Sequence, residues 1–170
     1  FQTTTDTEAI AYVIARERVN SGSVEKAVEL AMSHLKGAFS LIVMSAKKLI
    51  AARDPWGFRP LSIGRRGNAI MFASETCAFD SVGAEFVRDL EPGEIVVVDN
   101  GEIRTIDTHT KHATSNMCIF EYLYFARPDS IIAGQMAHDS RKLAGAYLSK
   151  EYPVDADVVI GVPDSGISAA

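Results

Sequence analysis

The spacing of apolar residues changes at Gly37, and this change limits the folds that the chain can adopt. In residues 6–19 and 23–37, apolar side chains recur every three or four positions, which is typical of helices with one buried face. After Gly37, apolar and polar residues alternate in short runs separated by turn residues, and this pattern indicates β-strands. Two helices followed by antiparallel strands predict a layered α+β unit that ends near residue 108.

Both predicted helices carry start and stop signals. Thr5 and Glu8 have the spacing of a capping box, in which each side chain accepts a hydrogen bond from the backbone N–H of the other residue. Ser23 is a favourable N-cap for the second helix. Residues 20–22 are a stop signal for the first helix, and Gly37 lies just past the end of the second.

Six short runs with β character predict a meander of antiparallel strands. Asn100 and Gly101 between the last two runs are typical of a tight hairpin, because both residues accept the positive φ that such turns need. Residues 74–82 predict a short helix between strands, with Ser74 as its N-cap and Glu75 at the positive end of its dipole. The six runs are residues 38–45, 48–54, 61–66, 69–74, 94–99 and 102–107.

A second unit of a different class is predicted to begin near residue 113. Residues 108–117 are polar and have few apolar anchors, so they are interpreted as a linker. A helix is predicted at residues 136–150, and residues 158–162 are apolar without alternation, as in a strand buried on both faces of a parallel sheet. The predicted domains are residues 1–108 and 109–170.

Charge and hydropathy exclude two classes of partner. The chain has 17 Lys and Arg against 22 Asp and Glu, a net charge of −5, and its basic residues are scattered, so no nucleic-acid or membrane surface is indicated. Its apolar runs are far shorter than the roughly 20 residues that span a bilayer. The start has no signal-peptide pattern and 2 Cys cannot form a disulfide framework, so a cytoplasmic protein is predicted. Because the chain lacks an initiator Met, we expect an internal segment of something longer.

The residues after the predicted buried strand, Pro163-Asp164-Ser165-Gly166, have two interpretations. Ligands of parallel sheets bind at the carboxyl ends of strands. Ser165 offers a hydroxyl to a phosphate or a cation, and Gly166 permits close approach of the backbone. The same residues also suit a type I turn with Ser165 as a helix cap. The residue types alone leave both interpretations open.

Residues 51–64 contain the only Trp of the chain, between Arg53 and Arg59. Taken alone, Asp54 to Gly57 predict a hairpin turn that joins two strands. The run RDPWGFRPL followed by FASE nevertheless resembles the second half of the class II glutamine amidotransferase domain, an N-terminal-nucleophile glutaminase. The run TTDTE, residues 4–8, is similar to the family segment that supplies a carboxylate for the α-amino group of bound glutamine.

Two further motifs distinguish among the relatives that share this domain. CIFEYLYFARPDS, residues 118–130, and DVVIGVPDSGISAA, residues 157–170, resemble the junction and the first phosphoribosyltransferase strand of the amidophosphoribosyltransferases. The resemblance covers essentially all 170 residues in order. It implies part of a layered N-terminal-nucleophile glutaminase sheet, followed by the start of an α/β type I phosphoribosyltransferase domain.

The resemblance implies an enzyme that hydrolyses glutamine, passes the ammonia internally and makes 5-phosphoribosylamine from phosphoribosyl pyrophosphate, the first committed step of purine biosynthesis. The family's glutaminase nucleophile is an N-terminal Cys, whereas residue 1 is Phe and the first Cys is Cys77, so this segment alone is expected to be inactive. Asp6 is the one glutamine-binding residue that the resemblance carries over. An acid that stabilises a helix N-terminus is the structural alternative for Asp6, and both roles are compatible.

The resemblance also implies two metal cofactors. Ser165 matches the position that helps to coordinate Mg²⁺ in a pyrophosphate loop, with residues 164–166 (Asp164, Ser165, Gly166) binding the phosphates. Cys118 matches one of four ligands of a [4Fe-4S] cluster in one branch of the family, and the other three ligands would lie outside this chain. A buried small hydrophobic residue is the alternative for Cys118, and Cys77 is expected to be structural.

The implied partners are glutamine and phosphoribosyl pyrophosphate as substrates, purine nucleotides as feedback inhibitors, and further copies of the chain in a dimer or tetramer. The alternative is a non-catalytic binding or regulatory module that keeps the scaffold without the chemistry. A parent gene that encodes a Cys as mature residue 1 upstream and an Asp-Asp phosphoribosyl motif downstream would favour the enzyme.

Overall fold

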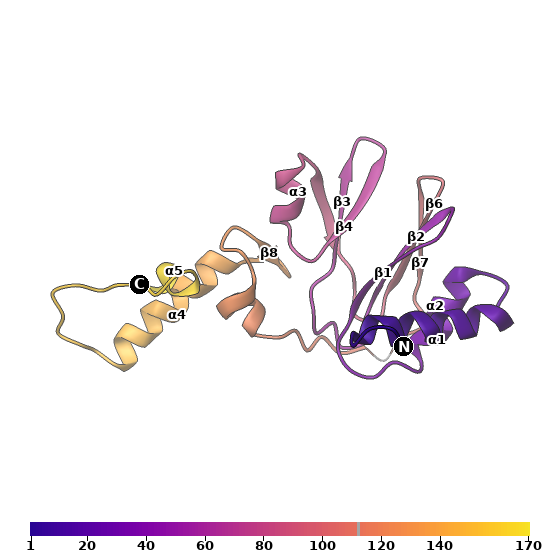
Figure 1. Ribbon diagram of the computed structural model, residues 1–170. Coiled ribbons are helices and arrows are strands. Elements are labelled where there is room, and N and C mark those ends of the chain that lie inside the picture. Colours follow the sequence, from indigo (N-terminus) through magenta and orange to yellow (C-terminus); the bar gives the residue numbers. More distant parts are fainter. Residues whose placement is uncertain (112) are drawn as a thin grey trace.

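Two helices and two antiparallel sheets form three layers in the computed structural model, which describes residues 1–111 and 113–170 (Figure 1). Helices α1 (Asp6–Asn20) and α2 (Val24–Met32) cover one face of the first sheet. The second sheet packs on the opposite face. We call this layered part, residues 1–107, the body, and residues 113–170 the arm. The predicted α+β class is confirmed for the body.

The helix starts follow from side chains that accept backbone hydrogen bonds. The Thr5 hydroxyl accepts from the Thr7 N–H at 3.4 Å, and the Ser23 hydroxyl accepts from the Lys26 N–H at 3.3 Å, so both predicted N-caps are confirmed. The capping box is wrong in its second half. Glu8 accepts from the backbone N–H groups that precede the cap, those of residues 2 and 3, both at 2.8 Å.

The first sheet has the strand order β1-β2-β6-β7, with every neighbouring pair antiparallel. Asn100 and Gly101 have φ of 51° and 83°, so the predicted tight hairpin joins the last two strands. The side chains of the central strands alternate between the helix layer and the second sheet. The strands are β1 (Ser40–Met44), β2 (Lys48–Arg53), β6 (Ile95–Asp99) and β7 (Glu102–Ile106).

The second sheet has the order β4-β3-β5, and it corrects the predicted single meander. The continuous apolar runs of β2 and β6 need cover on both faces, so the intervening strands leave the first sheet and pack across it. The sequence analysis missed β5, because its side chains are mostly exposed and do not alternate clearly. The strands are β3 (Ser62–Arg66), β4 (Ala69–Ala73) and β5 (Glu85–Asp89).

The predicted short helix forms as α3 (Cys77–Ser81), but it starts later than expected. Its N-cap is Thr76, which makes no side-chain capping bond, so the assignment of Ser74 as the cap is wrong. Glu75 lies before the helix, and its carboxylate accepts hydrogen bonds from the arm instead.

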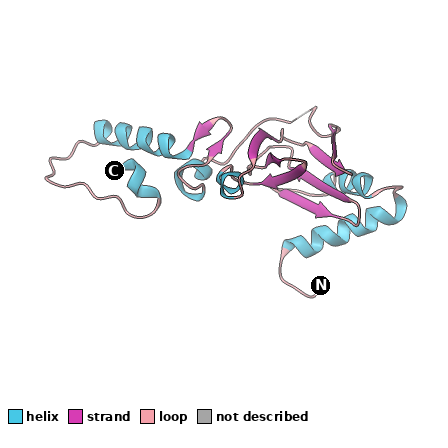
Figure 2. Ribbon diagram, turned by 90° about the horizontal axis from the view of Figure 1, so that it is seen from above, coloured by secondary structure: helices cyan, strands magenta, loops and turns pink. Residues whose placement is uncertain are grey.

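The arm extends away from the body, as both Figure 1 and Figure 2 show. The predicted linker has no regular secondary structure in its described residues, and the part of that prediction at residue 112 lies outside the described residues. The helix predicted at 136–150 is confirmed as α4. The arm contains a π-helical turn η1 (Glu121–Phe125), a hairpin of β8 (Ile131–Ile132) and β9 (Gln135–Met136), α4 (Ala137–Glu151) and α5 (Ser165–Ala169).

The strand predicted at residues 158–162 is absent from the described arm. Its side chains are exposed rather than buried, as Val158 at 71% and Val162 at 77% show. A strand of a parallel sheet needs neighbouring strands for its backbone N–H and C=O groups. The described arm supplies no such neighbour at this segment. Among the described residues, no helix is both long and apolar enough to cross a bilayer.

Candidate functional site

The loop that follows β2 is held from the inside by two buried charged side chains. Arg53 is 7% exposed, and its guanidinium donates to the carbonyl groups of Gly57 and Arg59, both at 2.8 Å, and to that of Leu90. Burial lowers the pKa of Arg53, and neighbouring carboxylates, that of Asp54 among them, oppose this effect. The predicted turn forms, with the Gly57 N–H donating to the Asp54 carbonyl at 2.9 Å. It connects strands of two different sheets, so the interpretation as a hairpin between paired strands is wrong.

Asp54 organises the same loop through backbone donors. It is fully buried, and its carboxylate accepts from the N–H groups of Trp56 at 2.9 Å, Phe58 at 3.2 Å and Phe39 at 3.3 Å. A buried carboxylate that accepts several N–H groups fixes the backbone around it. Arg53 and Asp54 therefore shape the loop and leave its outer edge free to contact the arm.

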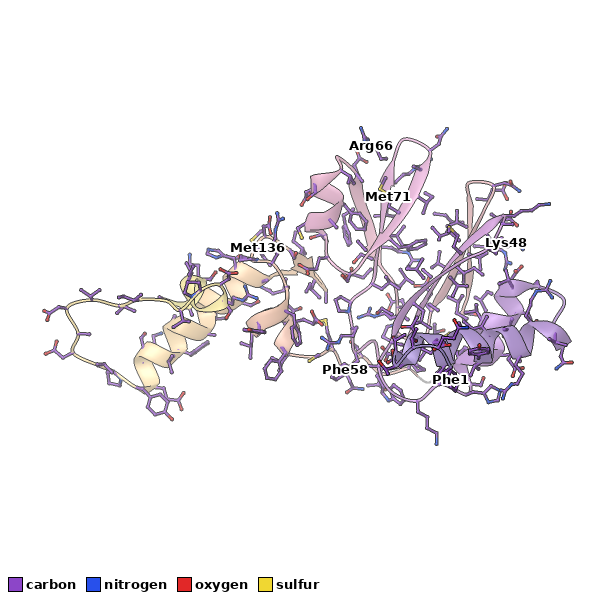
Figure 3. All side chains as sticks on the ribbon, viewed as in Figure 1. Phe1, Lys48, Phe58, Arg66, Met71 and Met136 are labelled. Carbon is purple, nitrogen blue, oxygen red and sulfur yellow. The ribbon has the colours of Figure 1, made fainter. Side chains whose placement is uncertain are left out.

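The outer edge of this loop, on which Figure 3 labels Phe58, contacts the first part of the arm. The carbonyl of Trp56 accepts from the Asn116 N–H at 2.8 Å, and that of Phe58 accepts from the Cys118 N–H at 3.0 Å. Arg59 pairs with the buried Glu121 at 2.5 Å. The motif that carried the resemblance thus joins the body to the arm.

Arg59 makes a second contact with the π-helical turn. Its guanidinium carbon lies 4.7 Å from the centre of the Phe125 ring, within the range of a cation–π interaction. The Arg59 side chain is 42% exposed, so water screens both contacts in part.

Three side chains at one end of the second sheet form a further connection that the sequence analysis missed. Glu75 Oε2 accepts from the Arg127 N–H at 2.8 Å and from the Ser130 hydroxyl at 2.7 Å. The Thr76 hydroxyl accepts from the N–H of residue 131 at 2.8 Å, and Asp89 accepts from that of residue 133 at 3.1 Å. We call Glu75, Thr76 and Asp89 the clasp. Because 44 to 55 residues separate the partners, no local sequence pattern predicts these hydrogen bonds.

Asp164 and Ser165 line a pocket of about 580 Å³ at the start of α5. Two arginines line the same pocket, but both already donate hydrogen bonds to other groups of the protein. Asp129 accepts from Arg127 at 2.7 Å and raises its pKa, and Arg141 donates to two backbone carbonyl groups at 2.7 Å. The other lining residues are Glu75, Tyr124, Phe125, Ala126, Pro128, Ile167 and Ser168.

Within the chain, the closest backbone approach in this loop is at Gly161, whereas the approach of a ligand to Gly166 stays a prediction. A Cβ at Gly161 would lie 2.6 Å from the Gly166 carbonyl oxygen, whereas the nearest atom to a Cβ at Gly166 is at 3.6 Å. The Gly166 N–H also donates to the Val162 carbonyl at 3.0 Å. A larger residue cannot occupy position 161, and the sequence analysis missed this requirement for Gly161.

The oxygen atoms of Asp164 and Ser165 are of the type that Mg²⁺ prefers, but they supply only part of a coordination shell. Cys118 is half-buried and Cys77 is buried, and both are free thiols. A single thiolate cannot hold an iron–sulfur cluster, so ligation by Cys118 stays a prediction. The described residues contain no group of three or more His, Cys, Asp and Glu side chains that could hold a metal.

Asp6 lies far from the other predicted site residues. It is exposed in the first turn of α1, with the hydroxyl groups of Thr5 and Thr7 each 3.5 Å from its carboxylate. Figures 1 and 2 both place α1 and α5 at opposite ends of the molecule. The structure thus separates the predicted glutamine-binding acid from the predicted phosphate loop, and it leaves both functional assignments as predictions.

Comparison with known proteins first defines the class of the body. Residues 1–81 match the family model described as a glutamine amidotransferase domain. This match covers α1 to α3, including the loop organised by Arg53 and Asp54.

Longer matches then define the particular family. All of the chain aligns with amidophosphoribosyltransferase from Methanocaldococcus jannaschii at 43% identity and from Bacillus subtilis at 44%, and with the chloroplastic enzyme of Glycine max at 46%. The alignments cover 39%, 35% and 30% of those relatives, so the chain spans about a third of their length. The resemblance predicted from the sequence is confirmed: the chain is homologous throughout to part of the amidophosphoribosyltransferases.

Two solved structures support the same relation. The glutamine phosphoribosylpyrophosphate amidotransferase of B. subtilis, complexed with ADP and GMP, matches 100% of this chain and 37% of its own with a TM-score of 0.92 and 45% identity. A structure described as the allosteric regulatory enzyme of purine biosynthesis matches 99% of this chain and 36% of its own, with a TM-score of 0.91 and 44% identity. The likeness therefore includes the arm as well as the body.

Proposed function

We propose that this chain is one segment of a transferase that makes 5-phosphoribosylamine from phosphoribosyl pyrophosphate and glutamine-derived ammonia, the first committed step of purine biosynthesis. One observation carries the proposal: the similarity continues through the arm, at 45% identity and a TM-score of 0.92 over the whole chain. A glutaminase joined to an unrelated partner would share only the body.

The proposed reaction has two halves. Water hydrolyses the side-chain amide of glutamine to give glutamate and ammonia, and a Cys nucleophile upstream of this segment would form the intermediate thioester. The ammonia then displaces pyrophosphate from the anomeric carbon of phosphoribosyl pyrophosphate. Residues 1–108 would belong to the first half, and residues 109–170 would be the linker and the beginning of the domain for the second.

Asp6 is proposed to accept a hydrogen bond from the α-amino group of glutamine. Its exposed position in the first turn of α1 supports this role, because a ligand can reach the carboxylate. An ionised carboxylate paired with an ammonium group forms a strong, charge-assisted hydrogen bond.

Asp164, Ser165 and Gly166 are proposed to bind the phosphates of the second substrate. Their place beside a pocket supports this role, since Asp164 and Ser165 line it. A Mg²⁺ ion held in part by the Ser165 hydroxyl would neutralise charge on the departing pyrophosphate.

The remaining partners are proposals of the same kind. Purine nucleotides as inhibitors are supported by the B. subtilis structure, which is a complex with ADP and GMP. A dimer or tetramer remains a prediction from the resemblance. A cytoplasmic location remains a prediction from the sequence, which has no signal-peptide pattern at its start and only 2 Cys.

The test of the proposed function uses the full-length protein that contains this chain. We expect it to release glutamate from glutamine and pyrophosphate from phosphoribosyl pyrophosphate in equal amounts when both are present. The 170-residue chain alone should release neither. A full-length protein that binds these ligands without turnover would favour a regulatory module instead.

Cys118 is proposed as one ligand of a [4Fe-4S] cluster. The Cys118 side chain is half-buried, and the Cys118 N–H donates to the Phe58 carbonyl. This hydrogen bond fixes the backbone that carries the thiol. In the full-length protein, Cys118→Ser should abolish the iron content and the brown absorbance, whereas Cys77→Ser serves as a control that retains both. Unchanged iron in the Cys118 variant would refute ligation.

A further inference from the structure

The clasp acts on the part of the arm that supports the start of α4. Ser130 is fully buried, and its hydroxyl donates to Glu75 at 2.7 Å. The Ser130 carbonyl accepts from the N–H of Ala137, the first residue of α4, at 3.0 Å. The Pro128 carbonyl likewise accepts from the His138 N–H at 2.8 Å. The position of α4 therefore depends on the segment that the clasp holds.

Helix α4 in turn contacts helix α5, which begins in the candidate phosphate loop, residues 164–166. His138 Nδ1 lies 2.9 Å from the hydroxyl of Ser168 in α5. Gly145 of α4 lets α5 come close, because a Cβ at this position would lie 2.0 Å from the Ala169 carbonyl oxygen. Helix α5, which begins at Ser165, thus rests on α4.

Glu75 is the centre of the clasp. Its Oε2 accepts from the Arg127 N–H, the Ser130 hydroxyl and the Cys77 thiol, the last at 3.6 Å. Thr76 and Asp89 each accept only one hydrogen bond from the arm. Loss of the Glu75 carboxylate would leave the fully buried Ser130 hydroxyl without its acceptor, which is costly away from water. The exposed Arg127 N–H would lose the same acceptor.

We propose that Glu75 is a positioning residue that fixes the candidate phosphate loop relative to the glutaminase body, and so couples glutamine hydrolysis to phosphoribosylamine synthesis. The coupling part rests on the proposed function. Ammonia released in one region has to reach the other, so a displaced arm should harm the glutamine-dependent reaction more than the reaction with ammonia supplied in solution.

The first test measures the positioning itself, and it needs no catalytic activity. In hydrogen exchange on this chain, Glu75→Ala should speed exchange of the Arg127 amide by about tenfold, because its acceptor is lost. The amides of residues 129–133 should also exchange faster, because the Ser130 side chain is no longer held and the segment opens more often. Glu75→Gln retains an oxygen acceptor and should have a smaller effect. Asp80→Ala, at an exposed position of the adjacent helix α3, should leave these amides unchanged.

Unchanged exchange of residues 127–133 in Glu75→Ala would overturn the inference. If that variant fails to fold, Glu75→Gln decides the question on its own, since it removes the charge and keeps the size. Amides in the central strands β2 and β6 serve as an internal reference, and they should exchange as in the unmodified chain.

The second test measures coupling in the full-length protein. The ratio of glutamine-dependent to ammonia-dependent phosphoribosylamine synthesis should fall about tenfold in Glu75→Ala and about threefold in Glu75→Gln. Asp80→Ala should keep the original ratio. A purely structural role for Glu75 would lower both rates together, so an unchanged ratio overturns the coupling. A wild-type protein that makes no product from either nitrogen source overturns the proposed function and the coupling with it, while the exchange test still decides the positioning.

Discussion

The body and the arm are stabilised in different ways. In the body, strands β2 and β6 place apolar side chains into two continuous clusters, one under the helices and one between the sheets. The arm has one small cluster of three buried residues, and its larger apolar side chains are mostly exposed. Backbone and side-chain hydrogen bonds to the body hold its first part instead. The body is therefore organised by burial, and the arm by polar contacts.

The same substitution in the two regions gives the largest contrast. Ile50 in β2 is 0% exposed and Ile160 in the arm is 83% exposed. Ile50→Ala should lower the free energy of unfolding by about 3 kcal/mol, through lost burial and a residual cavity. Ile160→Ala should change it by less than about 0.5 kcal/mol. Urea denaturation followed by far-ultraviolet circular dichroism measures both values.

The comparison between body and arm fails if Ile160→Ala is as destabilising as Ile50→Ala. That outcome would mean that the apolar segment of the arm is buried in solution. Sedimentation at several protein concentrations would then show whether a second copy of the chain covers it.

Much of the body could be predicted from the sequence, because its patterns are local. The spacing of apolar residues located α1 and α2, and Asn100-Gly101 located the hairpin between β6 and β7. The division into two sheets was not predicted. This division depends on which strands pair over long sequence distances, and the sequence pattern of a strand does not specify its partners.

The apolar runs at residues 95–98 and 158–162 show why the arm was harder to predict. Both runs are β-branched and lack alternation. The first pairs with strands on both sides and is buried, whereas the second has no partner in the described chain and stays exposed. A strand is thus defined by its neighbours as well as by its own residues.

The candidate site was predicted only where a motif carries it. Asp164 and Ser165 line a pocket, and their role in binding phosphates stays a prediction. Glu75 was assigned to a helix dipole, although its carboxylate binds residues 127 and 130. Contacts between residues more than 50 positions apart leave no periodic signal in one sequence.

Glu25 refines the comparison between the body and the arm, because this charged residue lies inside the body and makes polar contacts there. Burial alone would raise its pKa, but the hydrogen bond from Lys48 and further donors lower it from 4.5 to about 2. Arg104 also donates to the same carboxylate oxygen. Since the folded state prefers ionised Glu25, this stabilisation is complete above about pH 4.5 and is lost as the pH falls toward 2.

Glu25→Gln should therefore lower the free energy of unfolding by about 2 kcal/mol at pH 7, and by progressively less at lower pH. Urea denaturation at pH 7, 5 and 3 measures the change. Glu102→Gln, an exposed position in β7, serves as the control and should stay within about 0.5 kcal/mol of the unmodified chain. A difference between Glu25→Gln and the unmodified chain that stays constant with pH would contradict the assignment.

A smaller effect on global stability than at Ile50 or Glu25 is expected at Arg59, which joins the two regions. Arg59→Ala removes the ion pair with Glu121 and the contact with the Phe125 ring, but the Arg59 side chain is partly exposed. We expect a loss of about 1 kcal/mol or less in urea denaturation. Hydrogen exchange should nevertheless be several times faster at the amides of residues 118 and 121, because the arm loosens locally.

Arg66→Ala, at an exposed position of β3, removes an arginine that lies away from the arm and should change neither measurement. Arg59→Lys retains the charge without the planar guanidinium, so it should fall between Arg59→Ala and the unmodified chain. If Arg59→Ala destabilised the body as much as Ile50→Ala, the two regions would unfold as one cooperative unit. The stability of the body would then depend on its contacts with the arm, even though the apolar side chains of the arm lie outside the core of the body.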